Sequence, residues 1–108
     1  MTEKYKGDTG NQLGALVDNQ IRTADLSEAD KLRAYIAQKQ ALDFGQNGAK
    51  VAWRNSGLDR RGEVIPGPLY LYQGANCRPY THIINVNGER RVALGSACRK
   101  PDGTWQPD

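Results

Sequence analysis

The feature that most constrains the fold of this chain is the dipeptide Asn87-Gly88. It separates two runs in which apolar and polar side chains alternate. Asn-Gly is a preferred pair for a two-residue type I′ β-hairpin turn, because both turn residues take a positive φ there. A turn of this kind fixes the register of the two strands. Val86 should therefore face Glu89, and every pair further along the hairpin follows from that one.

The two cysteines, Cys77 and Cys98, face each other in this register. Their pair is of the non-hydrogen-bonded kind, which brings the Cα atoms to about 4.5 Å, a separation that a disulfide tolerates. We therefore predict a Cys77–Cys98 disulfide and, with it, an oxidising compartment such as the periplasm or the cell surface. If the two cysteines were buried free thiols instead, their position directly opposite each other in this register would be unexplained. A zinc site would need more ligands than the two cysteines and His82 supply.

The register also divides the side chains of the hairpin between two faces. One face is predicted to be the core side and carries Cys77, Thr81, Ile83, Val92, Leu94 and Cys98. The opposite face is predicted to be exposed, and its aromatic and basic residues form a candidate binding surface that consists of Arg78, Tyr80, His82 and Arg91. Tyr80 lies opposite Gly95, so we expect its ring to cover the glycine.

An amphipathic helix is predicted from about Glu28 to Phe44. Ser27 can cap its N-terminus, and Gly45 is predicted to end it in the left-handed conformation. The apolar stripe that should dock on the core side of the hairpin comprises Leu32, Tyr35, Ile36 and Leu42. A shorter helix is predicted within residues 10–22, where a GxxxG pair makes self-association through this segment a hypothesis.

Strand patterns at 49–54, 62–65 and 69–72 precede the hairpin. We therefore expect an α+β fold: an amphipathic helix packed on a small twisted antiparallel β-sheet of about four strands, preceded by a short N-terminal helix. Residues 1–25 would form an N-terminal segment and residues 26–108 the α+β domain. Trp53 and Trp105 are expected to be core residues, with the lining of a groove as the alternative.

The distribution of charge does not favour nucleic-acid binding. Fifteen Lys and Arg residues against twelve Asp and Glu residues give a net charge of +3, and the basic residues are scattered along the chain. Nucleic-acid binders usually gather basic residues on one face, between stacking aromatics. No run approaches the ~20 apolar residues of a membrane-spanning helix, and no signal peptide opens the sequence.

The sequence contains no candidate catalytic residue. His82 is the sole histidine, and no serine, cysteine or carboxylate beside it in the sequence would make a nucleophile or orient the ring. No spaced pair of carboxylates indicates an acid–base couple, and no glycine-rich loop has the strand-to-helix context of a phosphate site. We therefore expect no enzymatic activity, no catalytic residue, no cofactor and no metal.

Several short motifs are spread along the chain: Ala41-Leu42 at the end of the predicted helix, Trp53-x-Asn55, Gly62-x-Val64, Pro66, Cys77-Arg78-x-Tyr80 and the ending Ala97-Cys98-Arg99-Lys100-Pro101-Asp102-Gly103-x-Trp105. Through these motifs, residues 29–106 resemble the C-terminal domain of the rickettsial 17-kilodalton surface antigen family of outer-membrane lipoproteins. The stretch from Gly10 to Gly14 resembles the tail of the family's glycine-zipper segment. The resemblance implies a cell-envelope protein whose motif residues are structural.

These observations predict a non-catalytic domain of the bacterial cell envelope, in the outer membrane or periplasm, with a structural or binding role. Its partner would be an unknown envelope component or another protein. Contact with the membrane would run only through a lipid anchor that this sequence lacks. The alternative is a periplasmic or secreted inhibitor or immunity-type protein. A protruding loop at 55–61 would favour it, and an unbroken flat sheet face would count against it.

Overall fold

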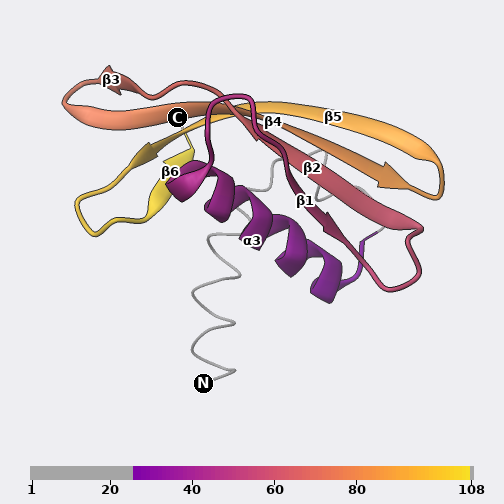
Figure 1. The fold of residues 1–108 in the computed structure, drawn as a ribbon. Helices are drawn as coiled ribbons and strands as arrows, with labels where there is room; N and C mark the ends of the chain where they lie inside the picture. The colour runs from indigo at the N-terminus through magenta and orange to yellow at the C-terminus, as the bar shows by residue number, and fades with distance from the viewer. Residues whose placement is uncertain (1–25, 108) are drawn as a thin grey trace.

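The computed structural model describes residues 26–107, which form one α-helix and a six-stranded antiparallel β-sheet (Figure 1). The elements are α3 (Glu28–Phe44), β1 (Val51–Arg54), β2 (Arg60–Pro66), β3 (Tyr70–Tyr72), β4 (Ala75–Val86), β5 (Glu89–Arg99) and β6 (Trp105–Pro107). The strands follow the order β1-β2-β4-β5-β6, and β3 pairs with β4 beyond the end of β2. Helix α3 lies across one face of this sheet (Figure 1).

The β4–β5 hairpin confirms the predicted register. Asn87 and Gly88 have φ values of 53° and 84°, and a type I′ turn requires a positive φ at both positions. At the far end of the hairpin Cys77 pairs with Cys98, and the two form a disulfide. A pairing fixed by two turn residues thus extends from Val86–Glu89 as far as Cys77–Cys98.

The predicted balance between helix and sheet is wrong. The expected α+β fold had about four strands and two helices, whereas residues 26–107 are mainly antiparallel sheet, with six strands and one helix. Strand β6 has no counterpart among the predicted strands, because a three-residue strand that ends in proline shows no alternation. The short helix predicted within residues 10–22 lies outside the described residues, as does the self-association that rests on it.

Helix α3 begins and ends where the sequence predicts. The Ser27 side chain accepts a hydrogen bond of 3.1 Å from the backbone N–H of Asp30, as an N-cap does. Gly45 follows the last helical residue, but its φ is −66°, so the predicted left-handed stop is wrong. Glycine is needed here for a steric reason, because a Cβ on Gly45 would lie 2.5 Å from the carbonyl oxygen of Ala41.

The helix packs on the sheet through smaller side chains than the predicted stripe. Its buried residues are Asp30, Ala34, Tyr35, Ala37, Gln38, Ala41 and Leu42. Of the predicted stripe, Tyr35 and Leu42 are buried, whereas Ile36 is 45% exposed. Alanines let a helix approach a sheet closely, so the larger side chains of the sheet fill the space between them at normal packing density.

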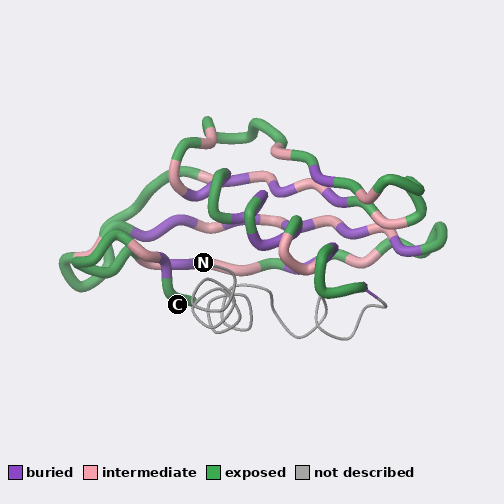
Figure 2. Tube along the Cα trace, turned by 90° about the horizontal axis from the view of Figure 1, so that it is seen from below, coloured by how far each residue is buried: buried purple, intermediate pink, exposed green. Residues whose placement is uncertain are grey.

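Helix α3 covers the face of the hairpin opposite to the predicted one (Figure 2). The covered face contains Arg78, Tyr80, His82, Ile84, Ala93 and Ala97, all buried. The open face contains Arg54, Arg61, Ile83, Asn85, Arg90, Val92 and Leu94, all exposed or half-buried. The predicted core side is therefore wrong. The covered face can be buried although it carries polar side chains, because their polar groups form hydrogen bonds inside the fold.

Candidate functional site

The four residues predicted as an exposed binding surface lie on the covered face. Arg78, Tyr80 and His82 are only 6%, 7% and 0% exposed, which contradicts the exposed surface predicted for them. The Arg91 side chain is 32% exposed and lies 3.8 Å from the carboxylate of Glu89. The contacts of the three buried residues explain their burial and show what each does in the fold.

Arg78 holds the C-terminal end of α3. Its guanidinium donates hydrogen bonds of 3.2 Å to the backbone carbonyls of Ala41 and Leu42, and one to the carbonyl of Gly45. Its Nε donates to the carbonyl of Gly67 at 2.7 Å. Carbonyls at a helix C-terminus lack helical partners and carry partial negative charge. The last turn of α3 has no basic residue of its own, so a cation from β4 satisfies these carbonyls.

His82 joins three elements through its two ring nitrogens. The indole Nε1 of Trp53 donates a hydrogen bond of 2.8 Å to His82 Nε2. Because indole can only donate, the proton of the neutral imidazole lies on Nδ1, which donates to Oε1 of Gln38 at 2.8 Å. Burial lowers the pKa of His82 to about 3. The ring is therefore neutral at neutral pH, and both of its nitrogens link β1, β4 and α3.

Tyr80 covers Gly95, as the hairpin register predicts. The two residues pair across the strands, and the Cζ of Tyr80 lies 2.6 Å from the position that a Cβ on Gly95 would occupy. No larger residue than glycine fits beneath the ring in this arrangement. The aromatic ring thus completes the packing of the covered face instead of reaching solvent.

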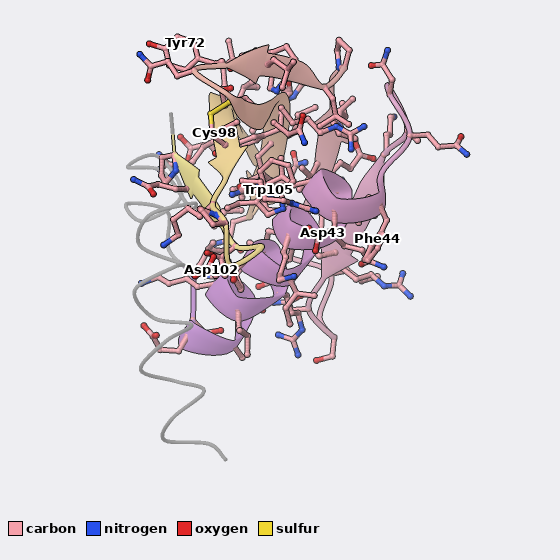
Figure 3. All side chains as sticks on the ribbon, turned by 90° about the vertical axis from the view of Figure 1, so that its left-hand side faces the viewer. Asp43, Phe44, Tyr72, Cys98, Asp102 and Trp105 are labelled. Atoms are coloured by element: carbon pink, nitrogen blue, oxygen red, sulfur yellow. A yellow bond between two sulfur atoms is a disulfide. The ribbon has the colours of Figure 1, made fainter. Side chains whose placement is uncertain are left out.

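A second polar cluster, centred on Asp43, has no counterpart among the residues predicted from the sequence. Asp43 Oδ1 accepts hydrogen bonds of 2.7 Å from Trp105 Nε1 and from Arg99, and its Oδ2 accepts one of 2.7 Å from Lys39. Burial raises the pKa of Asp43, but the hydrogen bonds from Lys39 and Trp105 and the charges of Lys39 and Arg99 outweigh it and hold this pKa below its usual value. Asp43 and Trp105 lie close together where β6 meets α3 (Figure 3), so the cluster joins the C-terminal strand to the helix.

The open face carries a row of three arginines. Arg54 pairs with Arg61, Arg61 with Asn85 and Asn85 with Arg90, so the row crosses β1, β2, β4 and β5. Side chains directly opposite each other in such pairs have Cβ atoms about 5 Å apart. Within residues 26–107, none of the three arginines forms an ion pair. No carboxylate in the described part of the chain thus neutralises their charges.

The row borders a hollow of about 470 Å³ on the open face. Besides the row, its lining includes Ala52, Glu63 and Ile83. The carboxylate of Glu63 lies 3.7 Å from the ammonium of Lys50, and within residues 26–107 it forms no ion pair with any arginine of the row. Guanidinium groups recognise carboxylates and phosphates through paired hydrogen bonds. The hollow is therefore suited to an anionic group.

Apolar side chains continue the open face away from the arginines. Val92 and Leu94, which follow along β5, are 41% and 76% exposed. Further along, β3 exposes Tyr70 and Tyr72 by 38% and 50%, and Tyr72 lies on the far side of the sheet from α3 (Figure 3). The open face is thus amphipathic, with guanidinium groups at one end and apolar side chains beyond them.

The arginine row is the feature of the candidate site that the sequence does not indicate. Its members look scattered in the sequence because they lie on four different strands. The short β1–β2 hairpin offers one usable signal, since its register places Arg54 opposite Arg61. The pairing of β2 with β4, which brings Arg61 beside Asn85, is long-range and leaves no local pattern. Among residues 26–107, no group of His, Cys, Asp or Glu could hold a metal ion, and no helix there is both long and apolar enough to cross a membrane.

Comparisons with a family model and with individual proteins agree on one protein family. Residues 40–106 match a protein family described as 17 kDa outer membrane surface antigen. The 17 kDa surface antigen of Rickettsia bellii is 40% identical over 97 residues, which cover 89% of this chain and 55% of that protein. The 17 kDa surface antigen of Rickettsia japonica is 38% identical over 84 residues, covering 77% of this chain and 53% of that protein. The chain thus spans about half the length of the curated relatives it matches. No solved structure matches it at a significant level.

Proposed function

Because this chain belongs to the 17 kDa surface antigen family, we propose that it is a non-catalytic binding domain of the bacterial cell envelope, with the open face of its sheet as the contact surface. The description of the family as an outer membrane surface antigen supports a location at the outer membrane. A lipid anchor of the kind that the sequence resemblance implies would lie outside residues 26–107. The domain itself would then contribute recognition at the envelope.

The observation that carries this proposal is the contrast between the two faces. On the covered face, Arg78 and His82 hydrogen-bond to helix carbonyls and neighbouring side chains. His82 is enclosed and neutral, so it is unsuited to proton transfer at neutral pH. On the open face, arginines that form no ion pair within residues 26–107 lie beside exposed apolar side chains. Exposed apolar area next to unused charge is typical of an interaction surface.

An inhibitor or immunity-type role receives less support from the β1–β2 loop. Its residues do not extend as a free loop. The backbone carbonyl of Asn55 accepts a hydrogen bond from the N–H of Leu58, and the N–H of Asn55 donates one to the carbonyl of Arg60. The carbonyl of Asp59 accepts a hydrogen bond from the N–H of Asn87 in the neighbouring hairpin turn. A short loop tied at both ends is poorly shaped to enter an enzyme's cleft, whereas the open face offers a broad contact area.

The test is sedimentation of the purified, disulfide-bonded chain with envelope fragments isolated from a Gram-negative bacterium. Leu94→Glu places a negative charge on the open face, and Ile36→Glu, the matched control, places one on the exposed side of α3. We expect Leu94→Glu to lower the bound fraction by about tenfold and Ile36→Glu to leave it unchanged. Equal effects of the two substitutions, or no retention of the unmodified chain, would contradict the proposed role of the open face.

A further inference from the structure

The arginine row has a cost in stability that the fold does not offset. Arg54 and Arg61 are directly opposite each other on neighbouring antiparallel strands, and like charges in such pairs repel. Asn85 separates Arg61 from Arg90, but no carboxylate in residues 26–107 pairs with any of the three arginines. An anion bound at the row would relieve this repulsion.

The geometry of the hollow indicates the kind of anion. Arg54, Arg61 and Arg90 line a space of about 470 Å³, together with Asn85 and Ile83. This volume falls in the range of small-molecule sites, about 300–1,000 Å³. Arginine forks match the oxygen atoms of a phosphate group, and several of them together suit a group with more than one charged oxygen.

The apolar part of the open face indicates what the anion belongs to. Val92 and Leu94 lie on the same face as the row and are exposed to 41% and 76%. A free phosphate would leave them in water, whereas a phospholipid places acyl chains directly beside its phosphate. A two-fold contact with the open face of a second copy fits poorly, because it would bring two arginine rows together and Glu63 is the one carboxylate in the hollow's lining.

We propose that the open face binds the surface of a membrane that contains anionic phospholipids. Arg54, Arg61 and Arg90 bind phosphate groups, and Val92 and Leu94 enter the boundary between head groups and acyl chains. This inference rests on the proposed function and names the partner of the same face. It differs from the sequence-based expectation that membrane contact runs only through a lipid anchor.

The experiment is vesicle flotation with the full, disulfide-bonded chain. The vesicles contain phosphatidylcholine alone, or phosphatidylcholine with phosphatidylglycerol as the anionic lipid. We expect binding to the anionic vesicles only, and loss of that binding in high salt, because salt screens charges at the surface. Each basic residue near an anionic membrane contributes enough that Arg54→Gln/Arg61→Gln should lower the partition coefficient about 30-fold.

Two further variants separate the proposal from its alternatives. Leu94→Ser should lower the partition coefficient by about tenfold, because it removes apolar area from the membrane boundary. Lys31→Gln/Lys100→Gln removes the same charge as the double arginine variant, but from α3 and the β5–β6 turn, and should bind like the unmodified chain. Equal losses in the lysine and arginine variants would show that only net charge matters and would overturn the site.

The remaining outcomes concern the source of the anion. Binding of soluble poly-glutamate without binding of anionic vesicles would assign the row to an acidic protein and overturn the proposal. Binding of inorganic phosphate without binding of vesicles would also overturn it. If envelope fragments are retained through the open face while anionic vesicles are not, the proposed function stands and the phospholipid assignment falls. If neither is retained, both fall.

Discussion

His82 is fully buried between Trp53 and Gln38, and its protonation is therefore coupled to folding. A proton on Nε2 would remove the acceptor that the Trp53 indole uses and would place an unpaired positive charge in the core. Burial for this reason lowers the pKa of the folded protein's His82 from 6.5 to about 3. Between these two values the unfolded chain binds more protons than the folded one.

The contribution of neutral His82 to the free energy of unfolding should therefore be fully present above about pH 6.5. It should be lost progressively as the pH drops toward 3. We expect the free energy of unfolding to be about 2 kcal/mol lower at pH 5 than at pH 7.5. Urea titrations at the two pH values measure this difference. His82 is the only histidine of the chain. His82→Gln should therefore remove most of the difference between the two pH values, whether or not the variant is itself less stable. An unchanged difference in that variant would exclude His82 as the cause.

Arg78 offers a second test at the scale of one residue. Arg78→Met keeps the unbranched stem of the side chain as far as the ε position but removes the donors to the carbonyls of Ala41, Leu42, Gly45 and Gly67. Buried acceptors that lose a charged donor should lower the free energy of unfolding by about 2–4 kcal/mol. Arg90→Met on the open face is the control and should change it by no more than about 0.5 kcal/mol. Similar urea midpoints for the two variants would contradict the role of Arg78.

At the scale of secondary-structure elements, local signals are sufficient for α3 and for the β4–β5 hairpin. The helix depends on the Ser27 cap and on its own spacing, and the hairpin depends on Asn87 and Gly88. The pairing of β2 with β4 depends on residues about 20 positions apart, and no turn sets its register. The sequence therefore indicates the cysteine pair but not the arginine row.

The disulfide should stabilise the hairpin mainly by restricting the unfolded chain. It joins residues that are 21 positions apart, and closing a loop of that length contributes about 3 kcal/mol in the chain-entropy description. Cys77→Ala/Cys98→Ala should lower the free energy of unfolding by about this amount and shift the urea midpoint.

Alkylation followed by intact-mass measurement checks the bond itself. The untreated protein should take up no alkylating group, and the reduced protein should take up two. Two groups on the untreated protein, purified from an oxidising compartment, would contradict the disulfide and would weaken the inference of that compartment.

At the scale of the whole molecule, the decisive question is which face of the sheet the helix covers. The hairpin register states which residues share a face, but it does not state which face is buried. The face with Ile83, Val92 and Leu94 is the more apolar one along the sequence, yet it stays open. The helix instead covers the polar residues Arg78 and His82, because the helix carbonyls, Gln38 and Trp53 satisfy them. Such partners become visible only when α3, β1 and β4 are assembled.

Two substitutions to serine distinguish the observed arrangement from the one that the sequence predicts. Ile84 is 1% exposed under the helix, whereas Leu94 is 76% exposed on the open face. Ile84→Ser leaves a cavity and a buried hydroxyl, and should lower the free energy of unfolding by about 3–4 kcal/mol. Leu94→Ser should change it by about 0.5 kcal/mol or less. Urea titration measures both values. The reverse order would mean that the helix covers the other face, and the arginine row would then lie on the same side as the helix and could not meet a planar membrane.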